Sequence, residues 1–278
     1  MVSVFVSIEV EMTSYRSIKL KNHIMKKSTL FHFILLPFFI FSCTVAKTLR
    51  TKQVKWNFKS FKKLTYDYEQ VVGMKNPFLD SLPSMKNVAK GKLILKVKSN
   101  GKADIILKDM KMVMRDIKQQ MPDQFIQDMD EYGKVDGDMN SQQRMLLQML
   151  FPIPTKKIKV NEVSKIPMKI PFSVPGSVIN VKGFNSVTLK QINGSSYDLS
   201  TGINCTDYTI PDEVEPKYDC FVKGKSQYQF DALAGYFKNG TVEIAMGMGV
   251  IAKEGTKEAK KMIVDMKTTI KLKLKKVE

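Results

Sequence analysis

The feature that most constrains the fold of this 278-residue chain is a strict alternation of apolar and charged residues near its C-terminal end. In the segment "IKLKLKK", Lys271, Lys273 and Lys275 alternate with isoleucine and leucine. Successive side chains of a β-strand point to opposite faces, so this pattern predicts a strand with one wet, cationic face and one packed face. A sheet with one apolar face must cover that face, and a curved sheet or open half-barrel around its own core does so.

Comparable strand patterns, rich in β-branched and aromatic residues, recur along the chain. They cover Val54–Lys59, Leu64–Val72, Lys92–Lys98, Ala103–Met114, Ile166–Val174, Val178–Ile192, Tyr197–Ile210, Phe221–Phe230, Thr241–Ala252 and Met262–Val277. The Asn-Gly pairs at 100–101, 193–194 and 239–240 predict tight turns. Because the strands follow one another without long helices, we expect a mainly antiparallel, all-β fold.

A short helical insert is expected at about 122–151. Its first helix is predicted at Pro122–Tyr132, with proline in the first turn, and its second at Asn140–Phe151, with Asn140 as the N-cap. The second helix carries an apolar stripe of Met145, Leu146 and Met149. These three are the candidate residues for lining an apolar ligand site, since flexible thioethers adapt to varied apolar partners; core filling is the alternative.

The stretch between the two predicted helices resembles the opening of a calcium-binding loop. Asp136, Asp138 and Asn140 stand at the first, third and fifth positions of such a loop. The sixth position is Ser141 instead of glycine, and the twelfth is Leu147 instead of glutamate. We therefore expect turn and N-cap roles here, and neither a metal site nor a cofactor.

Nucleophilic catalysis that depends on histidine is not expected. His23 and His32 are the only histidines, and both lie before residue 43, in the region that is interpreted below as an upstream extension and a signal peptide. The acids Asp128, Asp130 and Glu131 leave a carboxylate-based hydrolase as the least favoured function. The protein is thus expected not to be an enzyme.

The N-terminal region contains a pattern similar to an export signal, but 24 residues precede this pattern. Lys26 and Lys27 form a positive segment before the apolar run Leu30–Phe41, which is of signal-peptide length and too short to span a bilayer. We therefore interpret 1–24 as an upstream extension produced by a start site assigned too early, with Met25 as the true start. Residues 25–42 are then the signal peptide.

Cys43 ends this stretch in the context Ile40-Phe41-Ser42-Cys43, which is similar to the lipobox of bacterial lipoproteins. That resemblance implies acylation of Cys43 and a tether over 43–52, and Thr44 after the cysteine implies the outer membrane. The acyl chains would hold the protein stably to a membrane. The alternative is cleavage after Ala46, which would release a soluble secreted protein.

Cys205 and Cys220 are the other two cysteines of the chain. In an oxidising compartment an even pair predicts one disulfide, here across a proline-containing turn region. Two unpaired, buried thiols are the alternative.

The net charge of +18 comes mainly from lysine, because arginine occurs only at 16, 50, 115 and 144. Arginine supplies the bidentate fork that reads bases and phosphates, so a nucleic-acid partner is not expected. The lysines form a solvated surface or attract anionic headgroups and glycans of a cell envelope.

Two segments carry a family resemblance: "FPIPTKKIKVNEV" at 151–163 and "YQFDALAGYFKNGTVEIAM" at 228–246. They resemble an uncharacterised family of exported lipoproteins of Gram-negative bacteria. Asn161-Glu162 stands where that family usually has Gly-Asp. The resemblance implies an antiparallel β envelope protein and no known catalytic residues.

Together these observations predict a single β domain over 53–278 and a lipid-anchored envelope protein that binds an apolar or amphipathic ligand. The expected location is the outer membrane or periplasm, or the exterior if the chain is secreted. Expected partners are the membrane and a lipid, glycan or protein of the envelope. A surface module for structure or protein interaction is the alternative function.

Overall fold

The computed structural model describes residues 51–75, 85–114, 117–135, 141–174, 177–210, 218–252 and 260–278, all within one compact unit, 47–278. These ranges contain eleven strands and one helix: β1 (Lys63–Lys75), β2 (Met85–Val97), β3 (Ala103–Met114), β4 (Ile117–Gln120), β5 (Gln124–Met129), α1 (Ser141–Leu150), β6 (Val163–Val174), β7 (Ser177–Asn193), β8 (Ser196–Asp207), β9 (Tyr218–Asp231), β10 (Tyr236–Ala252) and β11 (Lys260–Val277). The predicted all-β class is confirmed.

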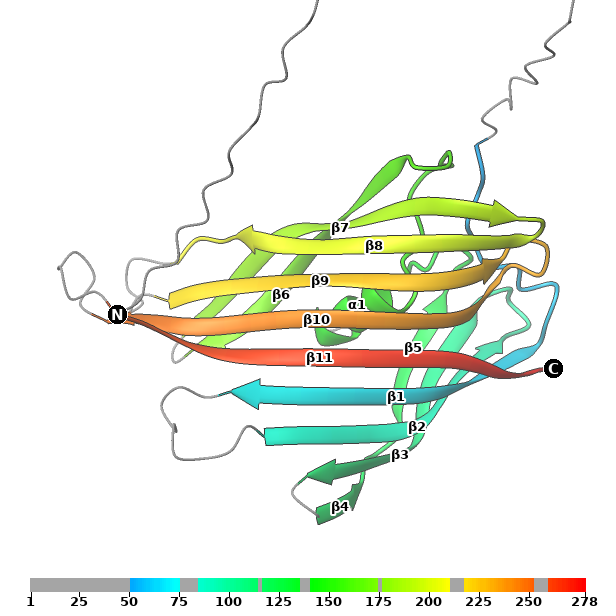
Figure 1. The fold of residues 1–278 in the computed structure, drawn as a ribbon. Coiled ribbons are helices and arrows are strands. Elements are labelled where there is room, and N and C mark those ends of the chain that lie inside the picture. The colour runs from blue at the N-terminus through cyan, green and yellow to red at the C-terminus, as the bar shows by residue number, and fades with distance from the viewer. Residues whose placement is uncertain are drawn as a thin grey trace, which may run out of the picture. The chain divides into compact units, whose positions relative to one another are not determined.

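All eleven strands belong to one antiparallel sheet that is not closed into a barrel. Its order is β4-β3-β2-β1-β11-β10-β9-β8-β7-β6, and β5 pairs with β3 beside β4. One edge is therefore β6, and the other is shared by β4 and β5. The sheet is strongly curved, and α1 lies on its concave side behind β10 (Figure 1).

The alternation that predicted β11 is confirmed by burial. Ile270 and Leu272 are buried on the concave face, whereas Lys271, Lys273 and Lys275 are exposed on the convex face. The concave face therefore holds the core, and the convex face is wet.

Two of the three predicted Asn-Gly turns are confirmed. Gly101 (φ 77°) joins β2 to β3, and Gly194 (φ 60°) joins β7 to β8. The third prediction is wrong, because Asn239 and Gly240 lie within β10. Gly240 is needed there for another reason: a Cβ atom at this position would lie 2.6 Å from the ring of Tyr228 on the neighbouring strand.

The helix predicted at Pro122–Tyr132 is also wrong, because this segment contains strand β5. Ile126 and Met129 both face the core although they are three residues apart, a spacing typical of a helix. Asp128 has a positive φ of 58° and the register with β3 shifts nearby, so one extra residue is accommodated between them. The second predicted helix is confirmed as α1, whereas 136–140, with the calcium-like motif and Asn140, lie outside the described residues.

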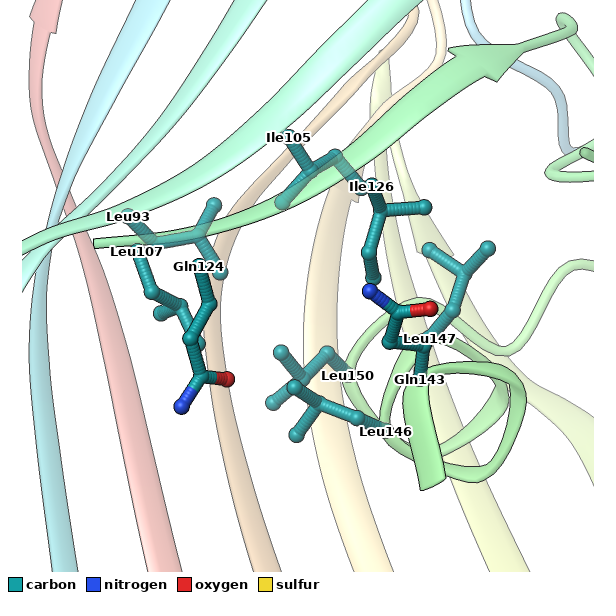
Figure 2. A pocket seen from close by; sticks show the side chains of 9 residues that line it. All are labelled: Leu93, Ile105, Leu107, Gln124, Ile126, Gln143, Leu146, Leu147 and Leu150. Carbon is teal, nitrogen blue, oxygen red and sulfur yellow. The ribbon is translucent and has the colours of Figure 1, made fainter. Parts of the chain in front are cut away.

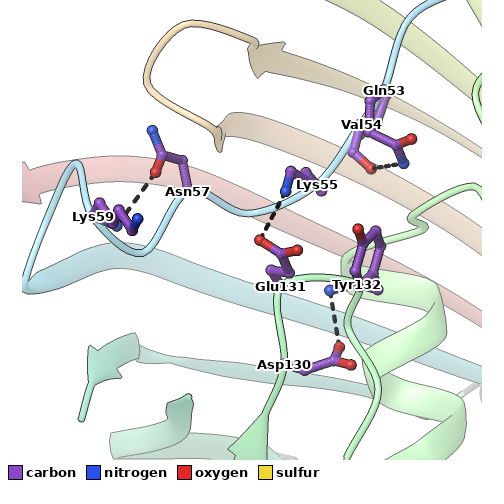
Figure 3. A network of polar contacts seen from close by, with 8 residues as sticks. All are labelled: Gln53, Val54, Lys55, Asn57, Lys59, Asp130, Glu131 and Tyr132. Carbon is purple, nitrogen blue, oxygen red and sulfur yellow. Dashed lines mark hydrogen bonds and ion pairs between the residues drawn. The ribbon is translucent and has the colours of Figure 1, made fainter. Parts of the chain in front are cut away.

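The segment Val54–Lys59 is not a strand, contrary to the prediction. Its backbone bonds go to different elements: Trp56 N–H donates to the Glu131 carbonyl (2.9 Å) and Asn57 N–H to the Gly235 carbonyl (2.9 Å). Lys55 also pairs with the Glu131 carboxylate at 2.9 Å (Figure 3). The alternation of buried Val54 and Trp56 therefore reflects a segment laid across one end of the sheet.

A cluster of aromatic side chains, called here the aromatic cluster, fills the core at that end. It consists of Trp56, Phe61, Tyr66, Phe151, Tyr228, Phe230 and Phe237, all buried. The Trp56 ring centroid lies 5.0 Å from that of Phe151 and 5.3 Å from that of Phe237, in edge-to-face geometry. Such contacts are favourable beyond the area they bury, so the aromatic cluster is a tightly packed part of the core.

Candidate ligand-binding site

Helix α1 is held by hydrogen bonds from the sheet to its last turn. The Asn185 amide donates to the carbonyl of Gln148 (3.2 Å), and the Tyr228 hydroxyl donates to the carbonyl of Met149. The last carbonyls of a helix have no partner within the helix, so side chains of β7 and β9 satisfy them. The C-terminal end of α1 is therefore fixed to the middle of the concave face.

Two glutamines link α1 to both edges of the sheet. The Gln143 amide donates to the carbonyl of Phe125 in β5 (2.9 Å), and the Gln148 amide donates to that of Pro167 in β6 (3.4 Å). The helix thus lies between the two open edges of the half-barrel. Single hydrogen bonds of this kind contribute about 0.5–1.5 kcal/mol each.

An apolar cavity lies between α1 and the part of the sheet formed by β2, β3 and β5 (Figure 2). Strands β2, β3 and β5 form one wall of the cavity, and α1 forms the other. Its lining is mainly aliphatic with two glutamines: Leu93, Ile105, Leu107, Gln124, Ile126, Gln143, Leu146, Leu147 and Leu150. The free space within it is about 20 Å³. That is room for about one water molecule, so helix and sheet are almost in contact.

A larger cleft lies beside the same helix, between the turn after β5, the proline-rich segment after α1, and β6. It has a volume of about 680 Å³, within the range of small-molecule sites. Apolar side chains such as Phe151 and Ile153 share its wall with polar ones such as Tyr132, Lys134 and Gln148. Leu147 lines both the cleft and the apolar cavity, so it separates the two spaces.

Of the three predicted lining residues, the structure places only Leu146 in the apolar cavity. Met149 is 2% exposed and belongs to the core, and Met145 packs against the core without lining either space. The three predicted residues therefore do not form one lining stripe, since only one of them faces the cavity. The lining residues of β2, β3 and β5 were missed because no local sequence pattern indicates that these strands lie next to α1.

The predicted disulfide is not present, because Cys205 and Cys220 are both free and buried. The register of β8 and β9 places Cys205 opposite Val222, so the two cysteines are offset by two residues along β9. Burial raises the pKa of each thiol to about 11. Both are therefore mainly protonated at neutral pH, as expected for structural thiols.

The three candidate carboxylates hold local structure. Asp128 pairs with Lys98 at 2.6 Å, which lowers the pKa of its carboxyl group. Asp130 accepts the N–H groups of Tyr132 and Lys134, and Glu131 pairs with Lys55. A general acid needs a raised pKa, so the shift at Asp128 has the opposite sign.

Other predicted features are outside the described ranges, including Cys43 and the signal region. Within those ranges, no helix is long and apolar enough to cross a bilayer. No group of three or more side chains of the metal-binding types gathers there either.

No protein-family model matches the sequence, and no curated protein matches it. Five chains of solved structures match. One belongs to the structure titled "Lipid-protein interactions in lipovitellin", with 12% sequence identity and a TM-score of 0.48. The match covers 80% of this chain and 26% of that chain, so this protein spans about a quarter of the length of that neighbour.

Proposed function

We propose that this protein binds an apolar or amphipathic ligand, such as a lipid, beside helix α1, and that it does so without catalysis. The observation that carries the proposal is the position of Leu147 between a mainly aliphatic cavity and an open cleft of about 680 Å³. The polar part of the ligand would occupy the cleft, and its apolar part would pass Leu147 toward the leucines of β2 and β3.

Entry of an acyl chain requires α1 to move away from β5. The free space of about 20 Å³ is too small for a chain, whereas the side chains around it offer a mainly apolar lining. Breaking the bond between Gln143 and Phe125 costs little compared with the burial of a ligand chain, at roughly 0.8 kcal/mol per methylene. The bonds from Asn185 and Tyr228 would keep the other end of the helix in place.

The direct test is a fluorescence titration with cis-parinaric acid. Thr155 is exposed and lines the cleft, so Thr155→Trp should narrow the cleft with little effect on folding. We expect it to weaken binding at least tenfold, a loss of about 1.4 kcal/mol. Thr241→Trp is the matched control, because Thr241 is exposed on the convex side of β10.

Unchanged binding in Thr155→Trp would remove the cleft from the proposal. No saturable binding by the native chain would favour a second candidate function, a structural or protein-interaction module of the envelope. The small volume of the apolar cavity supports that second function, since a nearly complete core offers a ligand little preformed space.

Attachment to the envelope through acylated Cys43 is a separate part of the proposal. It rests on the sequence Ile40–Cys43 and the apolar run before it. Metabolic labelling with a fatty acid in a Gram-negative host should label the native chain and not Cys43→Ala. An unlabelled native chain with an N-terminus at Lys47 would instead indicate a secreted protein.

A further inference from the structure

The outer face of β6 and β7 combines exposed apolar side chains with lysines. This patch, called here the β6–β7 face, consists of Val163, Lys165, Lys169, Val178, Lys182 and Phe184. Val163, Val178 and Phe184 are 49%, 49% and 46% exposed. Their neighbours along the strands, such as Ile166 and Ile179, are buried on the opposite face, so the exposed positions follow from strand alternation.

Two lysines of this patch are placed where their like charges reduce the stability of the sheet. Lys169 and Lys182 are direct partners in the register of β6 and β7, and like charges at such positions destabilise a sheet. Lys165 lies over the Phe184 ring, 5.5 Å from its centroid. None of the three lysines forms an ion pair with another described residue, although exposed Asp207 is the register partner of Lys182 on β8.

Several lysines elsewhere on the convex side are paired with acids. Lys90 pairs with Glu69 at 2.9 Å and Lys92 with Asp109 at 3.8 Å. These two lysines also face other lysines across β2 and β3, but an acid lies within reach of each. Lys223 on β9 is similar to the lysines of the β6–β7 face, because it has no ion pair with a described residue and lies 5.9 Å from the centroid of the Phe221 ring. The β6–β7 face combines three such lysines with Phe184 and Val178, each of which is nearly half exposed.

The edge of the sheet at this patch is not suited to pairing with another strand. Pro167 and Pro171 of β6 have no N–H group to donate, and lysines stand between and beside them. A partner must therefore bind the face and not the edge. Lysines attract anionic headgroups, and aromatic and aliphatic side chains beside them enter the interface of a bilayer.

We propose that the β6–β7 face docks on an anionic lipid surface, with Lys165, Lys169 and Lys182 on the headgroups and Phe184 and Val178 in the interface. This contact goes beyond the proposed ligand binding and does not depend on it. It would orient the half-barrel on the membrane independently of any acyl anchor.

The test is flotation of residues 47–278 with phosphatidylcholine vesicles that contain or lack phosphatidylglycerol. This compact unit holds every described residue and excludes both Cys43 and the apolar run before it. We expect binding only to the anionic vesicles, with loss at high salt. Because each lysine near such a surface contributes about fivefold, the variant Lys165→Gln, Lys169→Gln, Lys182→Gln should bind about a hundredfold more weakly.

The matched control is Lys90→Gln, Lys92→Gln, Lys275→Gln, which removes the same charge from the ion-paired part of the convex side. We expect it to lose less than tenfold, and Phe184→Ser alone to lose about tenfold. Equal losses in the two triple variants would overturn the proposal in favour of net charge alone. Equal binding to both kinds of vesicle, or to neither, would also overturn it, while the cis-parinaric acid titration without vesicles would report separately on the ligand site.

Discussion

Leu150 and Phe151 are adjacent in the chain but enter two very different interiors. Phe151 belongs to the aromatic cluster, where its ring lies 5.0 Å from Trp56 and 5.4 Å from Phe237. Leu150 faces the apolar cavity, where aliphatic side chains of α1 meet those of β2 and β3 and leave space for a water molecule. Interlocked rings permit few alternative arrangements, whereas flexible leucines at a helix-sheet contact can separate and repack. The comparison indicates a tightly packed aromatic cluster and a looser, aliphatic contact between α1 and the sheet.

The largest expected effect is the loss of Trp56 from the aromatic cluster. Trp56 is fully buried and contacts rings from three other parts of the chain. Trp56→Ala should lower the free energy of unfolding by about 3–5 kcal/mol, as for other buried aromatic residues. Urea unfolding followed by circular dichroism measures this. Phe58→Ala is the control, since Phe58 is only partly buried; an equal loss there would contradict a special role of the cluster.

Enlarging a side chain should distinguish the two regions next. Phe237→Trp adds volume to the aromatic cluster and should destabilise the fold by about 1–3 kcal/mol, because the rings leave no space for it. Leu146→Phe adds volume beside the apolar cavity and should change stability by less than about 1 kcal/mol. Thermal unfolding of the two variants compares them. Similar costs would mean that the helix contact is as rigid as the cluster.

The turn that supports the aromatic cluster should make it sensitive to acid. Burial alone would raise the pKa of Asp231, but N–H groups of Ala234 and Leu233 and the Lys238 ammonium outweigh it and lower that pKa. The stabilisation is therefore complete above the ordinary pKa of about 4 and is lost as pH falls through the lowered value. Asp231→Asn should cost about 1 kcal/mol at pH 7 and almost nothing in strong acid. Exposed Asp123 provides the control variant Asp123→Asn, and a pH-independent cost would rule out this ionic contribution.

The smallest effect on global stability is expected where α1 meets β5. Gln143→Ala removes the bond to the Phe125 carbonyl and should favour opening of α1 by about 0.5–1.5 kcal/mol, with little change in global unfolding. Amide hydrogen exchange should show faster exchange in α1 and unchanged exchange in β10 and β11. Equal acceleration in all three elements would mean that the helix opens only when the whole fold does.

The sequence predicted strands and turns best where one face of a strand is exposed to solvent. The lysines of β11 and the glycines at 101 and 194 define strands and turns by local chemistry alone, and α1 was placed to within one residue at each end. Local patterns failed where a contact between distant segments decides the conformation. The positive φ of Asp128 gives the buried residues of β5 a helix-like spacing. The close approach of the Tyr228 ring favours glycine at position 240 within a strand. Of the residues that line the candidate cavity, only Leu146 was predicted from the sequence as a lining residue, because most of the others come from β2, β3 and β5.

The position of β11 has a consequence for how this chain folds. Strands β1 to β5 and β6 to β11 form two groups of sequence neighbours, and the pairing of β1 with β11 joins them into one sheet. Residues such as Tyr66 and Leu274, near opposite ends of the described chain, must meet to form that pairing. Contacts between such distant segments form slowly because closing the loop costs entropy before any burial compensates for it. The seam between β1 and β11 should therefore limit the folding rate, and until it closes, the unpaired edges of both strands are the surfaces most prone to aggregate.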